Sequence, residues 1–268
     1  MTIALRRLAI RLPDVSYRAY RVWQRNRDVY LRLWKAEAIW PLAEPLITLL
    51  ALGVGLGGLV SRSELPGDQR YIEFIAPGIL AVFPMWTAAA ECGWGSFFRM
   101  ENQRTYHAII ATPVSIEDVI TGEILWGATR GLISSVYILA VTAAFGLLNS
   151  PLALLVPVAA YVSSFMFASV SLSYTSIARS ISSLNYFFAL FVTPQFWLGG
   201  VFFPLERLPE ELQVASWFVP ATHVVDIYRG LVEGNLNLGH LGDLAWIAVV
   251  GAVFYYLALV SMQRRLIQ

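Results

Sequence analysis

The stretch GGVFFPLERLPEELQVASWFVPATHVVDIYRG, residues 199–230, lies between two long apolar segments. Pro209 with two acidic residues behind it is typical of a helix start, because acidic side chains suit the positive end of a helix. Pro220 ends this first helix, and a second one is expected from Thr222, a candidate cap, to about Gly234. The stretch therefore predicts two short amphipathic helices that form a plug or lid at a membrane boundary. An ordinary surface loop with two helical turns fits the same pattern.

The composition is that of a membrane protein. The 268 residues are 57% hydrophobic and 14% charged, and the mean hydropathy is +0.60, which excludes an ordinary soluble domain. The net charge of only +1 indicates no nucleic-acid partner. Cys92 is the single cysteine, so an intrachain disulfide is excluded.

Six apolar spans are expected, each near the ~20 residues that cross ~30 Å of hydrocarbon. They run at roughly 40–60, 72–96, 118–147, 152–178, 184–203 and 243–262. The predicted fold class is all-α integral membrane, with one six-span domain at residues 38–268. A short outward-facing helical hairpin, about 204–234, lies between spans five and six.

Residues 1–37 are predicted to form a cytoplasmic N-terminal segment. Within it, residues 13–36 carry an apolar stripe that Asn26 interrupts, with arginines beside the stripe and Trp23 and Trp34 at its margin. This pattern favours an amphipathic helix that lies in the membrane interface. A soluble helix that binds a partner is the alternative.

The placement of basic residues predicts the orientation. Fourteen of the nineteen Arg and Lys residues fall on the side that holds both termini, and four fall on the other. Because positive residues concentrate on the cytoplasmic side, both termini are expected in the cytoplasm and the hairpin outside.

The stretch at 199–230 resembles the C-terminal signature of the type-2 ABC-transporter permeases, a family that exports O-antigen, teichoic acids, Nod factors and some drugs. The resemblance lies in Gly199, Gly200, Pro204, Leu205, Leu208, Pro209, Leu212, Gln213, Pro220, Thr222, His223, Asp226 and Arg229. A second stretch, MENQRTYHAIIATPVSIEDVITGEILWGATRG at residues 100–131, resembles the Nod-factor exporter permeases in particular.

The resemblance implies a permease that works as a pair of copies, with two cytoplasmic ABC ATPase subunits, in the bacterial inner membrane. A Walker A motif needs a lysine after glycine, whereas the only lysine, Lys35, follows Trp34. The chain is therefore expected not to be an enzyme and to hold no cofactor itself, with ATP and Mg²⁺ on the partner ATPase. The implied substrate is a lipid-linked oligosaccharide or similar amphiphile. A longer polysaccharide and a hydrophobic drug stay open.

The polar stretch of about residues 100–112 resembles the coupling helix that inserts into a groove of the ATPase. Its pattern alone fits a solvated intracellular loop equally well. The candidate coupling residues are Glu101, Arg104, Thr105, Tyr106 and His107.

Charged and aromatic residues inside the spans are candidates for a transport pathway. Glu123 and Arg130 are seven residues apart, so they share one helix face at about 10 Å along the axis. A buried arginine needs an ionic partner or contact with water, and Glu91 is a possible partner of Arg130. Trp86 and Trp197 lie well inside their spans. An ion pair that fixes helix packing, and tryptophans that face lipid or the core, are the alternatives.

Phe202, Phe203 and Pro204 end span five just before the hairpin. Two copies of this bulky pair of rings could meet on a two-fold axis and close the outer end to water, which makes these residues a candidate outer gate. Packing against span six is the competing interpretation.

Two other classes of protein fit the sequence less well. A secondary transporter ordinarily shows an internal repeat, and none is evident. An intramembrane enzyme needs a nucleophile with a base, or metal ligands. The three histidines (His107, His223, His240) are expected in loops, with no metal constellation, and no catalytic residue is predicted.

The orientation gives a first testable prediction. In a Cys92→Ala background, a cysteine placed at Gln213 is expected to react with a membrane-impermeant maleimide added outside the cell. A cysteine placed at Gln103 should react only after the cytoplasmic side is opened. Labelling of the Gln213 position from the cytoplasmic side alone would contradict the predicted topology.

Overall fold

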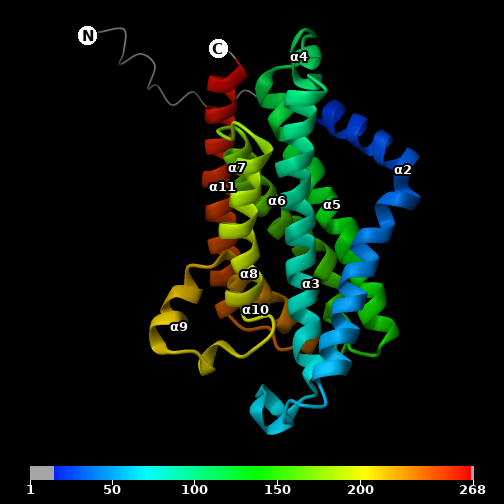
Figure 1. Cartoon of the computed structure of the whole chain (residues 1–268), viewed down its shortest axis with the longest axis vertical. Coiled ribbons are helices and arrows are strands. Elements are labelled where there is room, and N and C mark those ends of the chain that lie inside the picture. Colours follow the sequence, from blue (N-terminus) through cyan, green and yellow to red (C-terminus); the bar gives the residue numbers. More distant parts are fainter. Residues whose placement is uncertain (1–14, 267–268) are drawn as a thin grey trace.

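The computed structural model describes residues 15–266, which are helical with no β-strand in that range (Figure 1). The long helices are α2 (Arg18–Thr48, continued by π-helical η2, Leu49–Leu56), α3 (Tyr71–Ala90), α5 (Ile116–Ala144), α6 (Val156–Thr175) and α11 (Gly239–Leu266). The shorter helices are α4 (Thr105–Ile110), α7 (Ile181–Phe187), α8 (Thr193–Leu198), α9 (Glu210–Trp217) and α10 (Pro220–Glu233). The π-helical segments η5 (Glu91–Gly95), η6 (Phe98–Asn102) and η8 (Phe188–Val192) and the 3-10 turns η3 (Arg62–Glu64), η4 (Pro66–Asp68), η7 (Pro151–Leu155) and η9 (Leu205–Arg207) complete the described elements.

Five segments of the described chain are long and apolar enough to cross a membrane. They are Arg18–Leu56, Tyr71–Asn102, Ile116–Ala144, Pro151–Thr175 and Gly239–Leu266, which correspond to five of the six predicted spans. The helices run up and down, so that α4 and the end of α11 lie at one end of the bundle and the loop after η2 lies at the other (Figure 1). Which end faces the cytoplasm stays a prediction of the charge pattern. We call these two ends the terminal end and the hairpin end.

The predicted span at 184–203 is not among those five, although it forms one continuous helical run with a π-helical turn in its middle. It consists of α7, η8 and α8, and it ends at Leu198. Pro194 lies inside it, and Gly200 takes a φ of +69°, a left-handed conformation that suits glycine. The Arg229 Nη2 donates to the Gly200 carbonyl at 2.6 Å and holds this turn against α10. A sixth full span thus stays a prediction.

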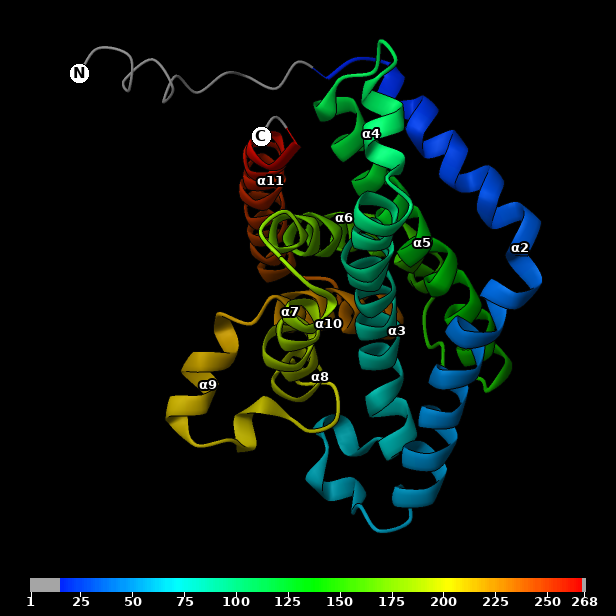
Figure 2. The same ribbon diagram turned by 45° about the horizontal axis from the view of Figure 1, so that its top comes forward.

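The predicted separate N-terminal helix is instead continuous with the first span, because α2 runs from Arg18 to Thr48 without interruption. It bends, so that its first half crosses α5 obliquely and its second half descends beside α3 (Figures 1 and 2). Ala19 and Val22 are buried against α5. A Cβ at Gly122 would lie 2.6 Å from the Ala19 carbonyl oxygen, so glycine there permits the close crossing.

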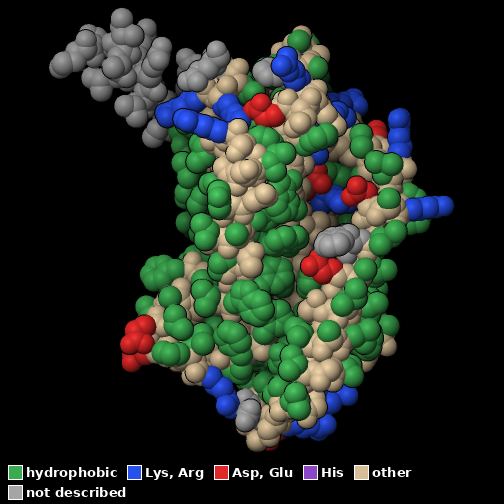
Figure 3. Space-filling model, in the orientation of Figure 1, with side chains coloured by type: hydrophobic (Ala, Val, Ile, Leu, Met, Phe, Trp, Pro, Cys, Tyr) green, Lys and Arg blue, Asp and Glu red, His purple; other side chains and the backbone are tan. Residues whose placement is uncertain are grey.

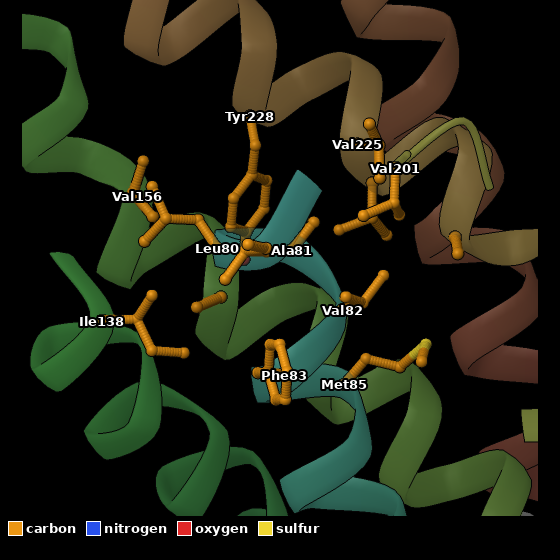
Figure 4. Close-up of a cluster of buried hydrophobic side chains, with 14 of the residues drawn as sticks. Leu80, Ala81, Val82, Phe83, Met85, Ile138, Val156, Val201, Val225 and Tyr228 are labelled. Carbon is orange, nitrogen blue, oxygen red and sulfur yellow. The ribbon is translucent and has the colours of Figure 1, made fainter. Parts of the chain in front are cut away.

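The second helix of the hairpin is not a surface lid. Most of α10 is buried, and it packs between α3, α6 and α11 beyond the end of α8 (Figure 2). In the core, Tyr228 of α10 points towards Leu80 of α3, with Val201 and Val225 beside them (Figure 4). Of the two hairpin helices, α9 is the one that projects from the bundle (Figure 1).

The start of α10 also differs from expectation. Thr222 does not cap it, since the Thr222 Oγ1 donates to the Ser216 carbonyl at 2.7 Å. The buried Gln195 of α8 accepts from the Ala221 N–H at 3.0 Å instead. The expected stop near Gly234 is confirmed, where φ is +78°.

Candidate functional site

The central feature of the bundle is Arg99, which lies between two carboxylates. Its Nη1 is 2.8 Å from the Glu91 Oε1, and its Nη2 is 2.5 Å from the Glu123 Oε2. Residues eight apart are about 80° apart around an ideal α-helix. The segments η5 and η6 are π-helical, and a π-helix has more residues per turn than an α-helix. This difference brings Glu91 and Arg99 onto the face that meets α5.

Glu123 is the most enclosed charge of the site, with 0% of its side chain exposed. The Asn26 Nδ2 donates to its Oε1 at 3.1 Å, and the Ser96 Oγ donates to its Oε2 at 2.9 Å. Asn26 therefore does not merely interrupt the apolar stripe of the first helix. It brings a hydrogen-bond donor to a buried carboxylate, which would be costly to bury without such partners.

Arg130 extends the set of charges to the second half of α2. Its Nη2 lies 2.6 Å from the Glu37 Oε2, its Nε lies 3.4 Å from the Glu91 Oε2, and its guanidinium stands over the Tyr30 ring at 4.6 Å. Alternating charges thus run from α2 through α5 to η5 and η6. We call this set the charge network, and its members are Glu37, Arg130, Glu91, Arg99 and Glu123.

A pocket of about 420 Å³ lies beside the charge network, between α2, α3 and α5. Glu37, Glu91 and Arg130 form its charged wall, and Trp86 and Trp94 form its aromatic wall. The two indole rings are 6.2 Å apart. Figure 3 shows acidic and basic side chains together in a hollow on this face. The pocket therefore offers ionic, hydrogen-bonding and apolar contacts to one ligand, and we call it the aromatic pocket.

The structure brings together three of the four predicted pathway residues. Trp86, Glu91 and Arg130 line the aromatic pocket. Trp197 does not, because it is 56% exposed and packs against Phe202 at 5.3 Å. The expected partnership of Arg130 with Glu91 is confirmed.

Sequence reasoning missed Arg99, Glu37 and Trp94. Hydropathy places Arg99 in a loop outside the spans. In the structure it pairs with Glu123, a residue of the third span. The eight-residue spacing of Glu91 and Arg99 does not place them on one face of an ordinary α-helix. They share a face only because of the π-helical turns. Glu37 lies just before the apolar run, so its contact with Arg130 depends on the bend of α2.

The candidate gate residues lie at the hairpin end of the bundle. Phe202 is half-buried against the core, and its carbonyl accepts from the Tyr71 Oη at 3.1 Å. Phe203 is half-buried and Pro204 is buried. These positions are compatible with packing and with a gate on a two-fold axis, so the gate stays a prediction.

The candidate coupling stretch forms the end of η6 and the short helix α4. Tyr106 is fully buried, so its ring anchors α4 rather than offering a docking surface. Arg104 is exposed, Thr105 is half-buried, and the Glu101 Oε1 pairs with the Arg265 Nη2 of α11 at 2.7 Å. The side chain of His107 lies outside the described part of the structure.

All three histidines are in helices rather than in the predicted loops, and His107 belongs to α4. His240 belongs to α11. His223 belongs to α10, where its Nδ1 is 2.8 Å from the Asp243 Oδ1 and its Nε2 is 2.8 Å from the Trp217 carbonyl. Within residues 15–266, no group of three His, Cys, Asp or Glu side chains is placed to hold a metal ion.

Comparison with known proteins assigns the family. The family described as "ABC-2 type transporter" matches residues 17–232, and the chain belongs to it. Nodulation protein J of Rhizobium leguminosarum bv. trifolii is 32% identical, over 96% of this chain and 97% of the relative. Nodulation protein J of Rhizobium meliloti is 32% identical, over 95% and 96%. The inner membrane transport permease YadH of Escherichia coli is 25% identical, over 91% and 93%. The resemblance to type-2 permeases, and to Nod-factor exporter permeases among them, is confirmed.

The charge network generates a prediction about stability. Arg99→Met leaves the Glu123 carboxylate buried without its cation, and we expect the free energy of unfolding in detergent to fall by about 3–5 kcal/mol. The matched control is Arg27→Met, which removes a partly exposed arginine paired with Asp28 and should cost about 0–1 kcal/mol. The double variant Arg99→Met/Glu123→Gln should recover part of the loss. Equal losses for Arg99→Met and Arg27→Met would contradict a role of the network in folding.

Proposed function

We propose that this chain is the permease subunit of an ATP-driven exporter that moves a lipid-linked oligosaccharide, or a similar amphiphile, outward across the bacterial inner membrane. Members of its family are membrane-spanning subunits of ABC transporters. Relatives named nodulation protein J, aligned over nearly the whole chain, support the amphiphile as substrate.

The observation that carries the proposal is the aromatic pocket. An amphiphile with a glycan headgroup needs flat apolar surfaces for its sugar rings and polar groups for its hydroxyls. Trp86 and Trp94 provide the first, and Glu37, Glu91 and Arg130 provide the second. Pockets of about 300–1,000 Å³ enclose a drug-sized ligand, so about 420 Å³ accommodates one part of the substrate at a time, as a pathway requires.

In the proposed assembly, two copies of the chain form the pathway on a two-fold axis, above two cytoplasmic ATPase subunits that bind ATP and Mg²⁺. The α4 region contacts the ATPase through exposed groups such as Arg104. Movement at α4 is transmitted by η6 to the charge network, because Arg99 connects η6 with α5. The Glu101–Arg265 pair connects the same region with α11. Rigid helices then carry the motion to the hairpin end.

The pathway part of the proposal predicts a loss of transport. Trp86→Ala removes one aromatic wall of the pocket, and we expect ATP-dependent uptake of a lipid-linked oligosaccharide into inside-out vesicles to fall about tenfold. Trp197→Ala is the matched control, since it removes an exposed tryptophan outside the pocket. Rates are normalised to folded protein by gel filtration. Unchanged oligosaccharide transport in Trp86→Ala would exclude this pocket. If the unaltered protein transports a hydrophobic drug but no oligosaccharide, the substrate class is hydrophobic drugs instead.

The coupling part is tested by charge reversal. Arg104→Glu should weaken copurification of the ATPase subunit and abolish substrate-stimulated ATP turnover, because such interfaces use charge-assisted arginine contacts. Arg62→Glu changes the same charge at the hairpin end and should leave both unchanged. Unaltered assembly and turnover in Arg104→Glu would remove this stretch from the ATPase interface.

A further inference from the structure

A second pocket, of about 450 Å³, lies at the terminal end of the bundle, away from the aromatic pocket. It opens between the end of α6, the turn that follows α6, and the last three turns of α11. Its lining is basic at one side and apolar at the other. The lining residues are Ser176, Ile177, Arg179, Leu257, Val260, Ser261, Arg264 and Arg265.

One of the three arginines in this pocket already has structural partners. The Arg265 Nη1 donates to the carbonyls of Thr175 and Ser176 at 2.7 and 3.1 Å, and its Nη2 pairs with Glu101. It therefore meets the free carbonyl groups at the end of α6, where a cation is favoured. Of the other two arginines, Arg264 lies in the last turn of α11 and Arg179 follows the end of α6.

Arg179 and Arg264 are exposed, and neither takes part in an ion pair among residues 15–266. Figure 3 shows basic side chains gathered over this end of α11. Two guanidinium groups on one pocket are suited to a phosphate, which accepts paired N–H bonds from arginine. The floor of the pocket is polar as well, because the hydroxyls of Ser176 and Ser261 contact each other at 2.5 Å.

The other half of the pocket extends into the membrane. Leu257 precedes Arg264 by seven residues on α11, so it lies on the same face, about 10 Å deeper along the helix axis. Leu257 is 45% exposed and Ile177 is 65% exposed, with Val260 between the apolar and basic parts. A ligand that fits must therefore carry a phosphate at the membrane boundary and a hydrocarbon chain below it.

We propose that this pocket binds an anionic phospholipid, with the phosphate between Arg179 and Arg264 and an acyl chain along Leu257. Basic pockets between spanning helices are suited to such headgroups. A soluble phosphate compound also carries negative charge, but it has no hydrocarbon chain to contact the apolar wall. The site is separate from the aromatic pocket and does not depend on the substrate proposed above. With the termini in the cytoplasm, the lipid belongs to the inner leaflet.

The test is native mass spectrometry of the full-length chain released from detergent with added lipid. We expect one tightly held phosphatidylglycerol, and about ten- to thirtyfold weaker binding to phosphatidylcholine with the same acyl chains. Arg179→Gln/Arg264→Gln should reduce phosphatidylglycerol binding by a similar factor. The matched control Arg62→Gln/Arg207→Gln removes two exposed arginines at the hairpin end and should leave it unchanged. Gel filtration and thermal unfolding confirm that each variant is folded.

Two further arms identify the source of the phosphate. Leu257→Gln keeps both arginines and should weaken phosphatidylglycerol binding several-fold, and millimolar inorganic phosphate should not displace the lipid. Displacement by inorganic phosphate with no effect of Leu257→Gln would overturn the lipid in favour of a soluble anion. Equal losses in the Arg179/Arg264 and the Arg62/Arg207 variants, or equal binding of the two lipids, would overturn the site itself.

Discussion

The rest of this structure depends on the burial of one carboxylate, that of Glu123, which no solvent reaches. A carboxylate inside a spanning helix is tolerated only with a cation and hydrogen-bond donors close by. Arg99 supplies the cation from η6, and Asn26 supplies a donor from α2. These requirements bring three segments, far apart in sequence, to one point in the bundle.

Local structure adjusts to satisfy this constraint. The end of the Tyr71–Asn102 segment contains two π-helical turns, and these rotate Arg99 towards α5. The first helix crosses α5 closely, at Gly122, which allows Asn26 to reach Glu123. Glu91 contacts both Arg99 and Arg130, so part of the same charge network, namely Glu37, Glu91 and Arg130, forms the charged wall of the aromatic pocket. A packing role and a pathway role for these residues are therefore compatible, because one set of ion pairs holds the helices together and lines the cavity.

The stretch at 199–230 illustrates how a family signature can be structural. Several of its residues bond to one another or to their neighbours. Arg229 holds the Gly200 turn, Gln213 donates from its side chain to the Leu208 carbonyl at 2.8 Å, and His223 joins α10 to α11 through Asp243. These bonds close the hairpin on itself and seat α10 in the core. The family pattern thus describes how the hairpin end is built, and α9 alone has the exposed position expected of a lid.

The sequence by itself determined the all-helical membrane class, five spans, the family, and the stop of α10 at Gly234. The family follows from the two signature stretches, and the other features follow from local properties: the length of an apolar run and the conformational freedom of glycine. Three residues that line the aromatic pocket were also predictable, since charges and tryptophans are unusual inside spans. The tertiary structure alone decided that Arg99 pairs with Glu123, that Asn26 and Glu37 belong to the network, that Trp197 does not line the pocket, and that α10 is buried. These depend on helix rotation, on bends and on which faces meet, and such relations between distant segments leave no periodic signal in either segment alone.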